Sequence, residues 1–122
     1  MTRQKYCGQS HEIFSQWIRD ECPDSKTGYQ VSDLDFILWN DRKKTLMLLE
    51  VKINNAAMKE WQAKLFRRLD ALFYRVAPDA GIKYLGLHYV TFTGADCDFK
   101  NGECYFDNER VSEDQLRELL SI

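Results

Sequence analysis

The hydrophobic pattern of the chain predicts two helices that each turn one apolar face inward. The first shows helical spacing at four apolar residues, Ile13, Phe14, Trp17 and Ile18. Because Ser10 can cap a helix, we expect this helix to run from Ser10 to about Glu21. The second helix is longer and runs from Ala56 to about Val76, where Pro78 follows and prevents its continuation.

Two apolar runs in the first half of the chain have the composition of strands. They extend from Leu34 to Trp39 and from Thr45 to Ile53, and the polar segment 41–44 separates them. Because so short a segment joins them, the two strands are predicted to form a hairpin. The second run is apolar on both faces except at Glu50 and Lys52, so we expect it to be buried on both sides of the sheet.

The rest of the chain adds a third strand, a hairpin and a short helix. The strand from Lys83 to Phe92 follows the long helix, and such a crossover favours parallel pairing with the strand before it. Asn101-Gly102 is a hairpin turn signal, and the cap-like Ser112 starts a helix that ends near Leu120. The order α-β-β-α-β with the added hairpin and helix predicts a single α/β domain, 1–122, whose mixed sheet is flanked by helices.

The composition agrees with one globular domain, since 44% of the residues are hydrophobic and 30% are charged. No apolar run approaches the roughly 20 residues that span a bilayer, and the polar start lacks the apolar segment of a signal peptide. We therefore expect a cytoplasmic protein with no membrane partner. The four cysteines form no CxxC pair, which favours reduced thiols over zinc. A net charge of −2 does not indicate nucleic-acid binding, so such binding needs local clusters of basic residues.

Two charged residues interrupt the buried strand. Glu50 and Lys52 are two positions apart, so their side chains project to the same face of the sheet. Burying an unpaired charge costs several kcal/mol, which makes such residues unusual in a strand this apolar. We therefore look for the chemistry of the protein at this hairpin.

The loop of the hairpin determines which acid lies opposite Glu50. A loop of two or four residues centred on positions 42–43 would pair Asp35 with Glu50, with β-carbons about 5 Å apart. A turn shifted toward the N-terminal end of this loop would place Asp33 there instead. We favour Asp35, because it lies deeper in the apolar strand and the first loop is richer in polar residues.

Two carboxylates and a lysine at one site suit phosphodiester hydrolysis. Like charges at such a distance raise the pKa of one another unless a divalent cation neutralises them. Carboxylate oxygens are hard ligands that suit Mg²⁺ or Mn²⁺. The nearby lysine supplies a positive charge for a phosphate oxygen or an attacking water, so the chemistry expected is that of a nuclease.

An acid on one strand followed by Glu50-Val51-Lys52 on the next resembles the PD-(D/E)XK nuclease superfamily, whose pattern is an acid and then Glu-x-Lys. The resemblance covers roughly residues 10–93 and implies a restriction-endonuclease-like core. It implies that Asp35 and Glu50 bind Mg²⁺ with the Val51 carbonyl as a third ligand, and that Lys52 assists the water or the scissile phosphate. The proline that precedes the acid in the family name is missing here, and Asp33 competes with Asp35 for the ligand position.

Further residues match the superfamily less closely. Many members have a glutamate on the first helix near the metal, which Glu12 resembles, and a glutamine after Glu-x-Lys, which Gln62 resembles. Glu12 also fits a solvated position in a first helical turn, and Gln62 fits an exposed helix position. The long helix carries a surplus of basic residues, a candidate phosphate-contacting strip whose default interpretation is a solvated face: Lys59, Lys64, Arg67, Arg68 and Arg75.

These features together predict a Mg²⁺- or Mn²⁺-dependent deoxyribonuclease, an endonuclease rather than an exonuclease, that cleaves by in-line attack of water on phosphorus. A chain this small has no room for a recognition domain, so we expect it to recognise branched or junction DNA or to work in a larger nucleoprotein assembly. A homodimer would let it cut two strands. Small members of the superfamily include Holliday-junction resolvases and phage nucleases, and a viral source would place it in the host cytoplasm.

Two alternatives remain open. An internal salt bridge between Asp35 and Lys52 would leave a catalytically inactive module that keeps the nuclease fold and binds DNA or another partner. The substrate could also be RNA.

Overall fold

A computed structural model describes residues 8–53, 58–94 and 96–122. The chain divides into two compact units, Met1–Ser32 and Asp33–Ile122, and each is described by itself. The candidate hairpin lies in the second unit.

The first unit contains helix α1 (Gly8–Glu21) and the short 3-10 helix η1 (Ser25–Thr27). Helix α1 ends where predicted, but it begins at Gly8 and not at Ser10. Within this unit its apolar face is not packed, since three large side chains are more than half exposed: Ile13, Phe14 and Trp17. One helix and one turn offer this face no second apolar layer to pack against.

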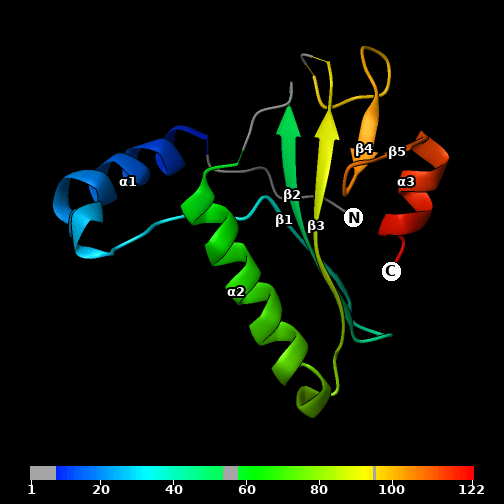
Figure 1. Cartoon of the computed structure of the whole chain (residues 1–122), viewed down its shortest axis with the longest axis horizontal. Helices are drawn as coiled ribbons and strands as arrows, with labels where there is room; N and C mark the ends of the chain where they lie inside the picture. Colours follow the sequence, from blue (N-terminus) through cyan, green and yellow to red (C-terminus); the bar gives the residue numbers. More distant parts are fainter. Residues whose placement is uncertain (1–7, 54–57, 95) are drawn as a thin grey trace. The chain divides into compact units, whose positions relative to one another are not determined.

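The second unit is built on a mixed sheet of five strands in the order β1-β2-β3-β4-β5 (Figure 1). The strands are β1 (Phe36–Asn40), β2 (Thr45–Ile53), β3 (Lys83–Phe92), β4 (Cys104–Phe106) and β5 (Glu109–Val111). Strands β2 and β3 are parallel, and the other neighbouring pairs are antiparallel. This confirms the predicted bounds of β2 and β3 and their parallel pairing, whereas β1 begins two residues later than predicted.

Helices α2 (Glu60–Val76) and α3 (Glu113–Leu120) cover opposite faces of this sheet. Leu48 packs on the α2 face with Ala77, and its neighbour Leu49 packs on the other face with Leu116 of α3. Because successive strand residues point to opposite faces, β2 is buried on both sides, as predicted. The predicted start of α2 at Ala56 lies outside the described residues. No helix in the described ranges is long and apolar enough to cross a membrane.

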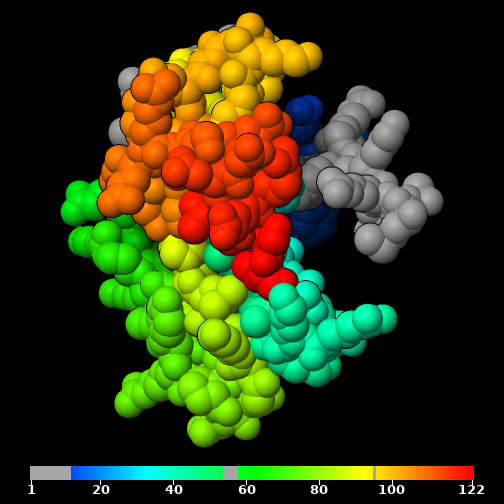
Figure 2. All heavy atoms as spheres, turned by 90° about the vertical axis from the view of Figure 1, so that its right-hand side faces the viewer, coloured from blue at the N-terminus to red at the C-terminus, as the bar shows by residue number. Residues whose placement is uncertain are grey.

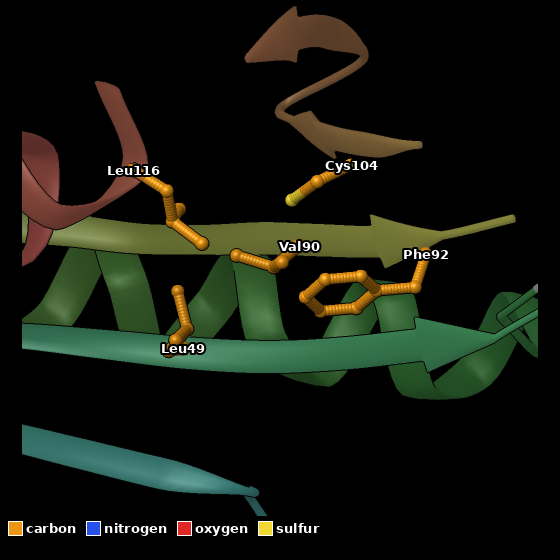
Figure 3. Packing of buried hydrophobic residues seen from close by; sticks show 5 residues of the cluster. All are labelled: Leu49, Val90, Phe92, Cys104 and Leu116. Atoms are coloured by element: carbon orange, nitrogen blue, oxygen red, sulfur yellow. The ribbon is translucent and has the colours of Figure 1, made fainter. Parts of the chain in front are cut away.

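The core under α3 joins residues from four elements. Figure 3 shows five buried side chains that point toward one another: Leu49 of β2, Val90 and Phe92 of β3, Cys104 of β4 and Leu116 of α3. In Figure 2, the red helix α3 lies over this face beside the orange hairpin β4–β5. The predicted N-cap of α3 is confirmed, since the Ser112 hydroxyl accepts from the Gln115 N–H at 3.1 Å and the Gln115 side chain accepts from the Ser112 N–H at 2.8 Å.

On the other face, a half-buried carboxylate ties α2 to β3. The Asp70 carboxylate accepts hydrogen bonds from the Tyr84 hydroxyl at 2.8 Å and from the Leu87 N–H at 3.0 Å. Between these two residues β3 contains a bulge, since Leu46 pairs with Tyr84 but Leu48 pairs with Leu87. Asp70 therefore fixes the helix against the irregular part of the strand.

The C-terminal hairpin exists, but its turn is not at Asn101-Gly102 as predicted. Residues 96–102 form bends, and the hairpin β4–β5 turns at Asp107 and Asn108. Both residues have positive φ, 49° and 70°, as a type I′ turn requires. The stronger glycine signal belongs to a loop in which the Asp98 carboxylate accepts the N–H groups of Lys100 and Asn101.

Two leucines on α3 test this description of the core. Leu116 is 9% exposed and Leu119 is 40% exposed. We expect Leu116→Ala to lower the free energy of unfolding by about 2–5 kcal/mol, because it leaves a cavity against Leu49. Leu119→Ala should cost less than about 1 kcal/mol. Urea denaturation of both variants measures the difference, and equal losses would contradict the packing.

Candidate active site

The loop between β1 and β2 determines which acid lies opposite Glu50. The paired part of β1 begins with Phe36 opposite Leu49, and the connecting loop is the four-residue segment 41–44. Carried one position further, this register sets Asp35 opposite Glu50 on the same face of the sheet. The predicted register is therefore confirmed, and the alternative register that sets Asp33 opposite Glu50 is wrong.

The carboxyl groups of Asp35 and Glu50 interact. Asp35 precedes β1 and is half-buried, and its side chain raises the pKa of Glu50 through hydrogen bonding and through its charge. Its Oδ2 also accepts the backbone N–H of Val51 at 2.8 Å. Since an ionised carboxylate has no donor, two carboxyl groups can share a hydrogen bond only when one of them is protonated. The raised pKa of Glu50 therefore favours a proton on this carboxyl when no metal is bound.

Glu50 is buried and incompletely paired. It is 4% exposed, and its Oε2 has no hydrogen-bond partner. Its Oε1 lies 3.9 Å from the Lys52 Nζ, which is an ion pair but too long for a hydrogen bond. A buried carboxylate oxygen without a partner is costly, so the site is suited to a proton or a cation that is not part of the chain.

The environment of Glu50 favours its neutral form. Burial is the largest cause that raises the pKa of Glu50 to about 7, followed by the hydrogen bond and the charge of Asp35. The Lys52 charge lowers this pKa and the Asp33 charge raises it, both by less. Near neutral pH the site therefore exchanges a proton readily, and a cation can replace that proton.

The chemistry of the donor set fits a hard divalent cation. Among the described residues, no group of three or more His, Cys, Asp or Glu side chains is arranged to hold a metal ion. The two carboxyl groups of Asp35 and Glu50 would therefore need a backbone oxygen or water to complete a site. In a strand, the N–H and C=O of one residue point to the same side, so the Val51 carbonyl faces β1, as its N–H does.

The other predicted site residues lie at varied positions. Asp33 is exposed, and its charge acts on Glu50 without lying opposite it. Gln62 is half-buried on α2, and the predicted basic strip of that helix is exposed: Lys59, Lys64, Arg67, Arg68 and Arg75. Glu12 is exposed on α1 in the first unit. The roles predicted for these residues stay predictions.

Sequence reasoning missed one residue beside the carboxyl pair. Tyr89 of β3 pairs with Glu50 in the parallel register, so the two side chains share a face. Burial is the main cause that raises the pKa of the Tyr89 phenol, followed by the charge of Glu50, while Arg67 lowers it. Tyr89 is therefore a neutral hydrogen-bond donor at the site. The sequence did not indicate Tyr89, because a regular register without the bulge would have placed a different residue beside Glu50.

Comparison with models of known protein families and with curated proteins found no match to this sequence. The function is therefore inferred from the geometry and electrostatics of the site.

The raised pKa of Glu50 predicts how stability depends on pH. Between the ordinary pKa of 4.5 and about 7, the folded state keeps a proton that the unfolded state loses, so the stability of the metal-free protein falls as pH rises. Glu50→Gln removes this loss. We expect the variant to gain up to about 3 kcal/mol over wild type between pH 4 and pH 8.

Urea denaturation in EDTA over this pH range measures the effect. Glu60→Gln is the matched control, since the Glu60 side chain is 85% exposed and its replacement should leave the pH profile unchanged. Coincident profiles for Glu50→Gln and wild type would contradict the assignment.

Proposed function

We propose that this chain is a Mg²⁺- or Mn²⁺-dependent nuclease that hydrolyses phosphodiester bonds in DNA. The observation that carries the proposal is the Glu50 carboxylate, buried with an unpartnered oxygen against Asp35. A buried carboxylate oxygen without a partner is costly, and a metal ligand requires an oxygen that is free to coordinate. The position of Lys52 beside this pair adds the positive charge that phosphate chemistry needs.

Each residue of the site has a separate role in this proposal. Asp35, Glu50 and the Val51 carbonyl would hold the ion, which when bound activates water and neutralises charge on the phosphate. Glu50 gives up its proton when it becomes a ligand. The Lys52 ammonium stabilises the charge that develops on the phosphate oxygens, and the neutral Tyr89 hydroxyl donates a hydrogen bond to the substrate.

The surroundings of the site support a nucleic-acid substrate. Helix α2 lies on the Glu50 face of the sheet. Its residues Lys64, Arg67 and Arg68 and its N-cap residue Lys59 are exposed, so they can bind backbone phosphates. The order α1, β1, β2, α2, β3 supports a restriction-endonuclease-like core and membership of the PD-(D/E)XK superfamily. We propose an endonuclease that prefers branched or junction DNA, acts in the cytoplasm and works as a homodimer or in a larger nucleoprotein assembly.

Removal of Lys52 tests the catalytic proposal. We expect Lys52→Ala to lower cleavage by about 10²-fold or more while DNA binding is retained, because its charge acts mainly in the transition state. The assay compares linear, flapped, junction and single-stranded DNA, with RNA as a further substrate, in Mn²⁺. Lys43→Ala is the matched control, since Lys43 is exposed in the β1–β2 loop and should be dispensable.

Two results of this assay would overturn the proposal. A fully active Lys52→Ala protein would exclude the mechanism. Binding of DNA by the wild type without any cleavage would identify an inactive module that keeps the fold.

The two aspartates before β1 test the ligand assignment. Mn²⁺ should raise the melting temperature of the wild type, since a ligand that binds only the folded state stabilises it. We expect Asp35→Asn and Glu50→Gln to lose most of this rise, and Asp33→Asn to keep it. If only Asp33→Asn abolishes the stabilisation, Asp35 is not the ligand.

A further inference from the structure

The outer edge of β1 carries the features of an unused pairing surface. β1 is the first strand of the sheet, and within the described residues no strand pairs with its outer side. Three of its large side chains are exposed: Phe36, Ile37 and Trp39. An edge strand that is apolar and free of charge is a template for another strand, and proteins usually protect such edges with charges or bulges.

The hydrogen-bonding groups of this edge can be assigned from the rest of the sheet. Lys44 O accepts the N–H of Lys83 on β3, so the even-numbered residues of β2 direct their backbone groups to β3. The odd-numbered residues therefore face β1, in agreement with the bond from the Val51 N–H to Asp35.

The register of the hairpin then shows which residues of β1 direct their backbone groups toward β2 and which direct them outward. The odd-numbered residues of β2 lie opposite Phe36, Leu38 and Asn40, which therefore bond to β2. The N–H and C=O groups of Ile37 and Trp39 point outward. These two residues are symmetric about Leu38.

We propose that two copies of this chain pair through antiparallel β1 strands, with a two-fold axis at Leu38. In this register Ile37 of each copy faces Trp39 of the other, and their outward backbone groups match as two hydrogen-bonded pairs. The facing side chains form aromatic and β-branched cross-strand pairs, which are favourable in sheets. Both sheets thereby join into one continuous sheet.

The ends of the pairing are compatible with this register. Asp35 of one copy comes opposite Asp41 of the other, and the Asp41 carboxylate is already ion-paired with Lys44 Nζ at 3.0 Å. Lys44 Nζ also lies 5.8 Å from the ring centroid of Trp39, so positive charge borders the new interface. These contacts limit repulsion between the facing acids.

The exposed area sets the expected strength of the dimer. The exposed parts of Phe36, Ile37 and Trp39 amount to roughly 300 Å² per copy, against roughly 800 Å² per partner in a standard stable interface. We therefore expect a dimer that forms at micromolar concentration and above and dissociates on dilution. Its formation does not rest on the proposed metal chemistry, since Ile37 and Trp39 carry the pairing and neither belongs to the metal site.

The dimer has a consequence for that site. A two-fold axis perpendicular to the sheet keeps both Asp35 residues on one face, six strand positions apart, or about 20 Å. Two copies of the site would then face one nucleic acid from the same side.

Amide hydrogen exchange, followed by NMR from about 10 µM to 1 mM, tests the pairing without substrate or metal. We expect the amides of Ile37 and Trp39 to exchange more slowly as concentration rises. The amide of Leu38 is the internal control, because it already bonds to β2 and should not change with concentration. Unchanged exchange at Ile37 and Trp39 while the protein dimerises would place the interface elsewhere and overturn the proposal.

Sedimentation velocity supplies a second measurement with a matched pair of variants. Ile37 is 68% exposed and Ile13 on α1 is 64% exposed. We expect Ile37→Lys to raise the dimer dissociation constant about tenfold or more, because the substitution acts twice in a two-fold interface. Ile13→Lys should leave it unchanged. A wild type that stays monomeric throughout this range, or a dimer that only Ile13→Lys disrupts, would overturn the proposal.

Discussion

The buried Glu50 carboxylate is the constraint on which the rest of the structure depends. It lies in a strand covered on both faces, beside a second acid and an ammonium group that is too distant to donate a hydrogen bond. Two ionised carboxyl groups at this position would destabilise the folded state, unless a proton removes one charge or a cation balances it. The free energy of ionising Glu50 depends on the register of β1, on the position of Lys52 and on the presence of Tyr89. The four side chains of the site therefore act as one unit.

Adjacent residues of β2 serve different purposes: one packs in the core and the next belongs to the candidate site. Leu49 points into the apolar core under α3, whereas Glu50 points to the α2 face with Asp35, Lys52 and Tyr89. The apolar face can therefore be well packed without restricting what the other face binds. A site placed on a strand that is held in this way from behind is rigid, and rigid support is what positioned ligands require.

Much of the second unit could be predicted from the sequence, because its signals are local and strong. The apolar run of β2 and the polar loop 41–44 were enough to predict the hairpin and the register that sets Asp35 opposite Glu50. Other features depend on contacts that no local pattern contains. The turn at Asp107 and Asn108 was missed in favour of an Asn-Gly pair, since the positive φ of both residues is set by the pairing of β4 with β3 and β5. Tyr89 was missed because its neighbour across the sheet depends on a bulge.

That bulge has a consequence for how the site could change. Gly86 has φ of 98°, and a β-carbon there would lie 2.7 Å from the Tyr74 hydroxyl, so the extra residue needs glycine. If the bulge straightened while β3 kept all its residues, Leu48 would align with position 86, and His88 in place of Tyr89 would stand beside Glu50. A phenol would give way to an imidazole without any substitution in the site. The chemical character of this face is therefore set by the register of the backbone as well as by residue identity, and changes that straighten the bulge offer a route to new activity that substitutions in the site do not.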